Sequence, residues 1–262
     1  MKNEIIKNHF RKISFLPAIL AVTLSTNANA DVNDTIEKTF SFDSDGKIQL
    51  SNVNGDVSIS ACGCNEVHLI AEITASNQEI RDRITVEIDE SSSNLRIKTR
   101  YKNNENRKRS WNNGHSQVTY TLSVPNDVQL SDIDLVNGDL KINGVTGKLK
   151  ADLVNGELHS DGLTSTTSVN MVNGDMDIKF ADLSNAERVN LESVNGNITV
   201  YLPSDADATL DAETVSGRIS NEFGINVVKH KYVGSEMRGA IGGGGVKINL
   251  DNVNGRIEVK SH

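Results

Sequence analysis

The sequence is poor in the residue types on which many catalytic and redox sites depend. Only 4% of its 262 residues are aromatic, and it has one tryptophan and two cysteines. Few aromatic rings are therefore available to stack on sugars. No thioredoxin-like pattern surrounds Cys62 and Cys64, and four of the histidines are scattered along the chain, namely His68, His115, His159 and His230. This composition predicts no metal site and no cofactor.

The sequence also lacks an apolar run that could cross a bilayer. The run from Ile13 to Leu24 is too short for that. It follows a basic stretch and precedes the small residues Ala28-Asn29-Ala30, which is typical of a secretory signal peptide. We therefore predict that residues 1–30 are a signal peptide, that the mature chain begins near Asp31, and that this mature chain has no transmembrane segment. The basic residues of the leader are Lys2, Lys7, Arg11 and Lys12.

Basic residues are in the minority after this leader. Residues 31–262 carry 23 Lys and Arg against 34 Asp and Glu, a net charge of −11. Such a charge opposes binding to nucleic acid or anionic lipid and favours cationic partners. The one basic cluster lies in the polar segment from Lys102 to Ser116, which has the composition of a solvated loop but is also a candidate binding loop. Its candidate residues are Arg107, Lys108, Arg109 and Trp111.

What the sequence has instead is a repeat. The tripeptide Val-Asn-Gly recurs at intervals of eighteen residues, and then twenty-two, with degenerate copies Val145-Thr146-Gly147 and Leu163-Thr164-Ser165 midway between the first three. The underlying period is therefore nine. The full copies begin at Val136, Val154, Val172 and Val194.

Each nine-residue unit reads as one strand and one bend. Apolar residues two positions apart indicate a strand with one buried face, and the recurring glycine supplies a tight corner. One coil of eighteen residues cannot bury enough apolar surface alone, so stacked coils forming a β-solenoid are expected. For the coil from Val136 to Leu153 we count six side chains as core, namely Val136, Leu140, Ile142, Val145, Leu149 and Leu153.

The corners of this solenoid are predicted at the Asn-Gly pairs and at Gly217. In stacked coils, the asparagines from Asn137 to Asn195 would form an amide ladder. The alternative is that each Asn-Gly pair forms the tip of an antiparallel hairpin, giving a meander. The predicted corner residues are Asn54, Gly55, Asn137, Gly138, Asn155, Gly156, Asn173, Gly174, Asn195, Gly196, Gly217, Asn254 and Gly255.

We expect one domain over residues 31–262. Residues 31–125 would form irregular N-terminal coils, and residues 126–262 the regular repeats, with Val253-Asn254-Gly255 in the last coil and the charged tail from Glu258 to His262 blunting that end. The glycine run from Gly242 to Gly245 lacks the ending of a P-loop, so it reads as a loop.

Two further features invite a functional interpretation. Acidic residues follow four of the corner glycines, but Asn197, Arg218 and Arg256 occupy the later places, so we interpret this row as solvated corners and not as an acid/base or calcium site. The cysteines flank Gly63 at an expected turn, as a disulfide between Cys62 and Cys64 or as two free thiols. The acidic residues are Asp56, Asp139, Glu157 and Asp175.

Several short motifs, in this order, resemble the DUF4097 "putative adhesin" family of β-strand-repeat proteins. They are Tyr120-Thr121-Leu122-Ser123-Val124-Pro125, the Asn-Gly corners, Val200-Tyr201-Leu202-Pro203 and the glycine-rich approach to Val253-Asn254-Gly255-Arg256-Ile257. The resemblance covers nearly the whole mature chain. It implies an all-β, single-stranded β-helix-like solenoid in an exported or envelope protein of bacteria, and it implies no established activity.

The sequence therefore favours a non-catalytic, adhesin-like binding module of the cell envelope, placed in the periplasm, with the cell surface or secretion as alternatives. Its partner would be an envelope protein or a surface glycan. The alternatives are a structural protein that self-associates through exposed terminal strands, and a periplasmic sensor component. A polysaccharide-active enzyme is less consistent with the few aromatic residues.

Overall fold

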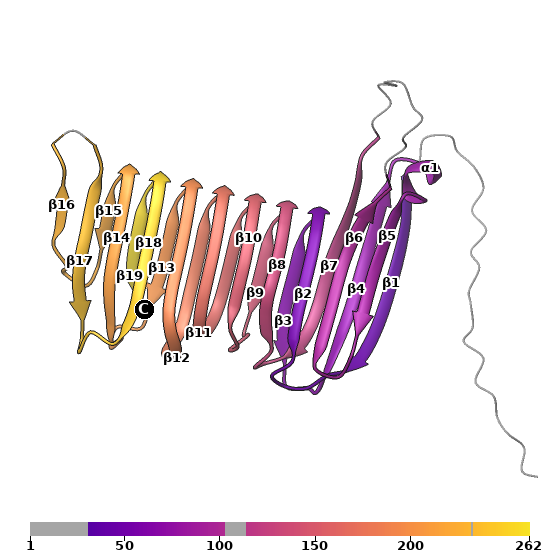
Figure 1. The fold of residues 1–262 in the computed structure, drawn as a ribbon, viewed down its shortest axis with the longest axis horizontal. Helices are drawn as coiled ribbons and strands as arrows, with labels where there is room; N and C mark the ends of the chain where they lie inside the picture. The colour runs from indigo at the N-terminus through magenta and orange to yellow at the C-terminus, as the bar shows by residue number, and fades with distance from the viewer. Residues whose placement is uncertain (1–30, 103–113, 232) are drawn as a thin grey trace, which may run out of the picture.

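The computed structural model describes residues 31–102, 114–231 and 233–262, which form an elongated stack of β-coils (Figure 1). Two sequence predictions fall outside the described residues. One is the signal peptide over residues 1–30, and the other is the candidate binding loop with Arg107, Lys108, Arg109 and Trp111.

Nineteen strands and one short helix make up the described chain. The first seven strands and the helix are β1 Val32–Ser41, β2 Lys47–Asn54, β3 Val57–Cys62, β4 Glu66–Ala75, α1 Gln78–Arg81, β5 Ile84–Glu90, β6 Asn94–Tyr101 and β7 Ser116–Pro125. The following strands are β8 Gln129–Asn137, β9 Leu140–Asn143, β10 Leu149–Asn155, β11 Leu158–Asn173, β12 Met176–Asn195, β13 Ile198–Leu202, β14 Ala208–Ser216, β15 Ile219–Asn221, β16 Val227–Lys229, β17 Ser235–Ile241, β18 Val246–Asn254 and β19 Ile257–Ser261.

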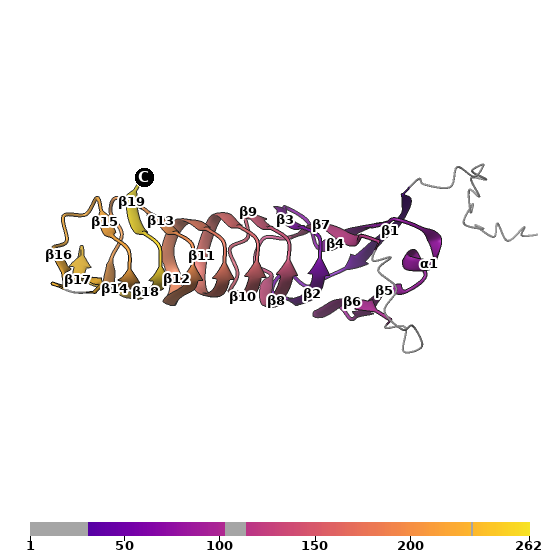
Figure 2. The same ribbon diagram turned by 90° about the horizontal axis from the view of Figure 1, so that it is seen from above.

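Each regular coil has two faces, which belong to one continuous sheet of nineteen strands, and Figure 2 shows the coils from above. Face A contains the strand segment that precedes each corner, and face B contains the segment that follows it. β11 and β12 each run through both faces. Neighbouring coils pair in parallel: β8 pairs with β2 and β10, while β9 pairs with β3 and β11. Antiparallel hairpins with Asn-Gly tips are therefore excluded, and the predicted solenoid is confirmed.

The order of coils in space differs from their order in the sequence. β18 lies between β12 and β14, with Asn254 beside Asn195 on one side and Ser216 on the other. β19 likewise lies between β13 and β15. The prediction that the C-terminal coil and the tail after Glu258 close one end was therefore wrong. That end is formed by β14 and β15. β17 pairs antiparallel with β14, and β16 pairs antiparallel with β17.

The opposite end is built by residues between two coils that stack directly on each other. Asn54 in β2 pairs with Asn137 in β8. The intervening chain makes an antiparallel extension in which β4 pairs with β7 and β5 pairs with β6. β1, which precedes β2 in the sequence, pairs with the other edge of β4. β2 and β3, in contrast, belong to a coil that stacks in parallel on β8 and β9.

Burial alternates along most of each strand as it approaches a corner. In β8, Ile133 and Leu135 are buried, so the next residue, Val136, must point outward, and it is 39% exposed. The sequence analysis counted Val136 as a core residue, which was wrong. The six-residue core of that coil loses this valine, whereas Leu140, Ile142, Val145, Leu149 and Leu153 are buried as expected.

Candidate functional site

Hydrogen-bonded asparagines run along the corners of the coils. Each side-chain amide donates through Nδ2 to Oδ1 of the asparagine in the next coil. The distances are 2.8 Å from Asn137 to Asn54, 2.9 Å from Asn155 to Asn137, 2.9 Å from Asn173 to Asn155, 3.0 Å from Asn195 to Asn173 and 3.0 Å from Asn254 to Asn195. This amide ladder crosses six coils and ends where Ser216 replaces asparagine.

The residues around this ladder also hold the coils together. Gly156 has φ +145°, and a Cβ there would lie 2.1 Å from the carbonyl oxygen of Gly138 in the neighbouring coil. Two of the carboxylates that follow the corner glycines also bond to the next coil. Asp139 Oδ1 accepts the backbone N–H of Glu157 at 2.8 Å, and Asp175 Oδ1 accepts that of Asn197 at 2.7 Å. These carboxylates bond coil to coil, and Asn197 does the same for Arg256 at 3.0 Å.

A row of outward-facing valines lies immediately before the ladder. Each regular coil contributes one, and their side chains are between 39% and 48% exposed. Because neighbouring strands are about 4.8 Å apart, the row extends for about 29 Å. We call it the valine row; in spatial order it consists of Val53, Val136, Val154, Val172, Val194, Val253 and Val215.

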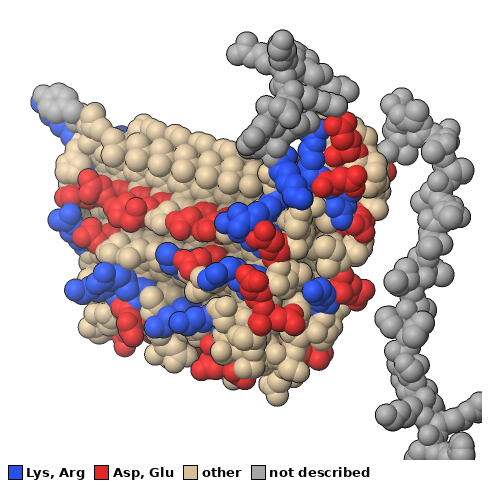
Figure 3. Space-filling model, turned by 45° about the vertical axis from the view of Figure 1, so that its right-hand side comes forward, with Lys and Arg blue, Asp and Glu red and all other residues tan. Residues whose placement is uncertain are grey.

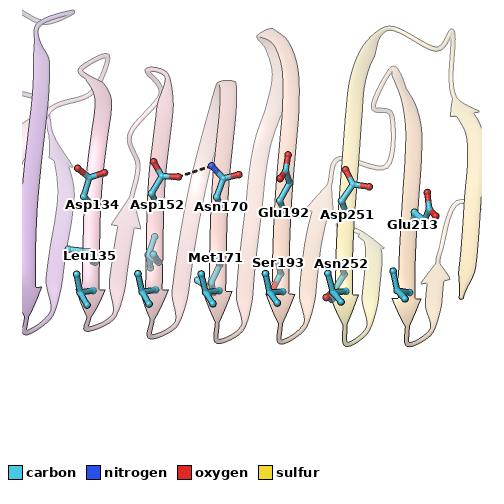
Figure 4. A pocket seen from close by; sticks show the side chains of 17 residues that line it. Asp134, Leu135, Asp152, Asn170, Met171, Glu192, Ser193, Glu213, Asp251 and Asn252 are labelled. Atoms are coloured by element: carbon cyan, nitrogen blue, oxygen red, sulfur yellow. Dashed lines mark hydrogen bonds between the residues drawn. The ribbon is translucent and has the colours of Figure 1, made fainter. Parts of the chain in front are cut away.

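A second row lies two residues earlier on the same face, where side chains again point outward. We call it the acidic row; in spatial order it consists of Asp134, Asp152, Asn170, Glu192, Asp251 and Glu213. Figure 4 shows these six side chains along one line above the strand ends. In Figure 3 a band of tan atoms runs along the edge of the molecule, and a band of red atoms lies beside it.

The two rows line one groove of about 590 Å³. Its floor includes the buried residues Leu135, Leu153 and Met171, and toward the end at β14 it becomes polar at Ser193 and Asn252. Ser193 and Asn252 are each 4% exposed, and Ser193 Oγ and Asn252 Oδ1 have no hydrogen-bond partner among the described residues. The groove is thus apolar along most of its length, acidic on one side and polar on its floor at one end.

Three carboxylates lie together at that end. Arg238 interacts electrostatically with one of them, Glu213, but forms its own ion pair with Asp211. Glu192 and Glu213 lie directly opposite Asp251 on its two neighbouring strands. None of the three forms an ion pair with any residue that the structure describes. Partial burial, and then the charges of Glu192 and Glu213, raise the pKa of Asp251 above its ordinary value.

Two residues before the acidic row on the same strands, by contrast, a carboxylate is neutralised by a basic side chain. Lys150 Nζ donates to Asp132 Oδ1 at 2.7 Å, and Gln49 Nε2 donates to Asp132 Oδ2 at 2.8 Å. The hydrogen bond from Lys150, followed by that from Gln49, lowers the pKa of Asp132. On this face Asp132 is paired with Lys150 and Asp211 with Arg238, whereas the three carboxylates at the end of the groove form no ion pair with a described residue.

Sequence reasoning identified the corners but missed both rows that line the groove. A signal was present, because Leu135-Val136, Leu153-Val154 and Met171-Val172 each place two apolar residues in succession. In a strand, one member of such a pair must face outward. The polar residue that precedes each pair then faces outward beside it.

The remaining candidate features lie away from the groove. A disulfide joins Cys62 and Cys64, whose Cα atoms are 5.2 Å apart, at the turn between β3 and β4. Within residues 31–102, 114–231 and 233–262, no group of three or more His, Cys, Asp or Glu is arranged to hold a metal ion. No helix formed by these residues has the length and apolarity needed to cross a membrane.

Comparisons with known proteins agree with this architecture. The family model described as Toastrack DUF4097 matches residues 33–260. No curated protein matches the chain. The crystal structure of a "putative cell adhesion protein" from Clostridium sporogenes has 18% identity and a TM-score of 0.51, over 88% of this chain and 100% of that one. At this identity the likeness shows the fold alone.

Two further crystal structures are less similar. A "putative adhesin" from Bacteroides fragilis has 14% identity and a TM-score of 0.37, over 87% of this chain and 97% of that one. A "putative lipid binding protein" from Parabacteroides distasonis has 11% identity and a TM-score of 0.27, over 90% and 98%. TM-scores this low carry no argument about function.

Proposed function

The chain belongs to the Toastrack DUF4097 family, and from that premise we propose that it is an exported, non-catalytic binding module of the bacterial cell envelope. In this proposal, the groove between the valine row and the acidic row is its binding surface. The partner is an envelope protein or a surface glycan. The structure from Clostridium sporogenes is named as a putative cell adhesion protein, which supports a binding role.

One observation carries this proposal: seven coils each expose a valine at the same place. High strand propensity explains single exposed valines on a sheet. It does not explain an unbroken row of them beside a second row that is polar in every coil. Contiguous exposed apolar surface bordered by polar residues is typical of interaction sites.

The binding test compares two matched variants of the purified protein. V154T/V172T/V194T keeps the branched shape and strand propensity of the valine row but makes it polar. D161N/D177N/E258Q changes carboxylates on face B and serves as the control. Each protein is immobilised, and retention of an envelope fraction from the producing bacterium is measured by biolayer interferometry against a cytosolic fraction.

We expect retention of envelope material to fall about tenfold in the valine variant and to stay at the wild-type value in the control, with equal melting temperatures. Equal retention by all three proteins would show that the groove is not the binding surface.

Export has its own test. Residues 1–30 have the pattern of a signal peptide. Fractionation followed by N-terminal sequencing should recover a chain beginning near Asp31 from the periplasm. An intact N-terminus in the cytosol would overturn this part of the proposal.

Self-assembly is a second candidate function, favoured by the terminal strand β1. It pairs only with β4 among the described strands, so its outer edge is free over a strand of ten residues. Such an edge is a template for pairing with another chain. Glu37 and Lys38 on this strand are exposed charges of the kind that discourage such pairing.

A further inference from the structure

We propose that the groove binds a cationic amphipathic helix, whose apolar face lies on the valine row and whose basic side chains face the acidic row. This inference rests on the proposed function, because it names the ligand of the same surface. It depends on four properties of the groove: its apolar row, its unpaired charge, its length and its lack of free backbone groups.

The unpaired charge requires a cation. Glu192, Asp251 and Glu213 are opposite one another in three consecutive coils. Like charges directly opposite on neighbouring strands are destabilising. A Lys or Arg side chain of the ligand, placed beside these carboxylates, would relieve the repulsion. Next to them, Ser193 Oγ and Asn252 Oδ1 are buried and unpartnered among the described residues, so this end of the floor can also accept a polar group.

The apolar row requires that the ligand be amphipathic. A simple cation would neutralise the carboxylates but would leave the valine row in water. A neutral alkyl chain would cover the valine row but would leave the carboxylates unpaired. Only a ligand with an apolar face and a basic flank satisfies both rows together.

The backbone of the coils favours a helix over an extended peptide. At the groove, strands of neighbouring coils already pair with each other on both sides, as β18 does with β12 and β14. An extended ligand would find no free strand edge there and would bury unpaired peptide groups. A helix pairs its own backbone internally, and a helix of about 19 residues has the length of the valine row.

The acidic row is not uniform, so the contribution of its carboxylates should differ along the groove. Asp152 Oδ1 already accepts a hydrogen bond from Asn170 at 2.7 Å, and Asp134 Oδ2 accepts one from Ser51 at 3.3 Å. The three carboxylates near β14 have no such partners. The basic residues of the ligand should therefore matter most at that end.

The test measures, by fluorescence anisotropy, the binding of synthetic peptides of about 19 residues to the purified full chain. The probe is a Leu/Lys peptide with leucines on one helical face and lysines beside them. Its controls are the same peptide with Glu for Lys, a scrambled peptide of the same composition, and a Leu/Lys peptide with strand-like alternation. A neutral alkyl detergent below its micelle concentration tests a simple apolar ligand.

We expect that the helical Leu/Lys peptide binds and that the control peptides and the detergent do not. Added salt should weaken the binding of the helical peptide. E192Q/D251N/E213Q should weaken it about 3- to 100-fold, and D134N/D152N should weaken it less. V154T/V172T/V194T should weaken it about tenfold. D161N/D177N/E258Q removes three carboxylates from face B and should leave it unchanged.

The inference is overturned if the Glu peptide, the strand-like peptide or the detergent binds as well as the probe, or if the face B variant weakens binding as much as E192Q/D251N/E213Q does. Failure of the inference alone can be distinguished from failure of the proposed function. If no peptide binds while retention of envelope material still depends on the valine row, only the choice of ligand is wrong. If both measurements are insensitive to the valine row, both proposals fail.

Discussion

At the scale of single residues, the corner glycines differ from the loop glycine Gly243 in what surrounds them. At Gly156 the space for a side chain is filled by the backbone of the next coil, whereas at Gly243 the nearest atom to an added Cβ is Asp207 Oδ1 at 3.4 Å. Backbone cannot move aside without separating the coils. The corner glycines are therefore required by packing between coils as well as by their positive φ.

The Gly156→Ala variant should lose about 3 kcal/mol or more of unfolding free energy, because it combines a strained φ with a backbone clash. Gly243→Ala should change stability little. Urea unfolding of the two variants measures this difference. Similar midpoints for both would contradict the close approach seen at the corner.

The carboxylates beside the groove lower stability in the ligand-free protein. Asp251→Asn should stabilise the protein by about 0.2–1 kcal/mol at pH 7, because it removes repulsion with Glu192 and Glu213. The pKa of Asp251 is raised in the folded protein, so the penalty is absent below the ordinary Asp pKa of about 3.9 and grows as the pH rises through the raised value.

Thermal melts of wild type and Asp251→Asn across this pH range provide the measurement. The advantage of the variant should shrink on acidification and disappear below about pH 3.9. Asp132→Asn is the control. It removes the negative charge that pairs with Lys150 and one of the two oxygens that accept from Lys150 and Gln49, so it should lower stability at pH 7. A destabilised Asp251→Asn variant would show that this carboxylate has a structural role.

At the scale of elements, the insertion of β18 and β19 makes the C-terminus internal. These strands separate two coils that the chain makes earlier, and they supply the buried side chains Ile248, Leu250, Ile257 and Val259. The stack toward β14 can close only when the C-terminal coil is in place.

Deletion of residues 246–262 should therefore abolish cooperative unfolding. The four buried side chains contribute about 6–12 kcal/mol, comparable to the whole stability of a typical protein. Deletion of residues 31–41, which removes the edge strand β1 with no fully buried residue, is the control and should leave a folded solenoid. Circular dichroism melts measure both. A cooperative melt after the C-terminal deletion would contradict the internal position of that coil.

At the scale of the whole molecule, stacking converts one residue per coil into a continuous surface. No single coil has a binding site, because one valine and one carboxylate are an ordinary patch of sheet. Six coils in register produce a groove with one apolar side and one acidic side. A long surface of this kind suits an elongated ligand.

A binding module with this groove should be a monomer. Light scattering should give the mass of one chain at all concentrations, because exposed charges such as Glu37 and Lys38 oppose pairing at the free edge of β1. A mass that rises with concentration, and returns to that of one chain after deletion of residues 31–41, would favour self-assembly.

The sequence by itself determined the local design of this protein. Short-range sterics and strand geometry explain the corner glycines, the apolar residues two positions apart and the eighteen-residue spacing. These features can therefore be recognised in the sequence alone. These features were sufficient to predict an all-β solenoid and to suggest the family to which it belongs.

Only the tertiary structure decided the order of the coils and the surface they form. Which coil stacks on which depends on matching free edges, and residues distant in the chain, such as Asn195 and Asn254, meet for that reason. Val136 points outward because Leu135, the residue before it, faces the core between face A and face B. The groove exists because strands from six separate parts of the chain hold a common register.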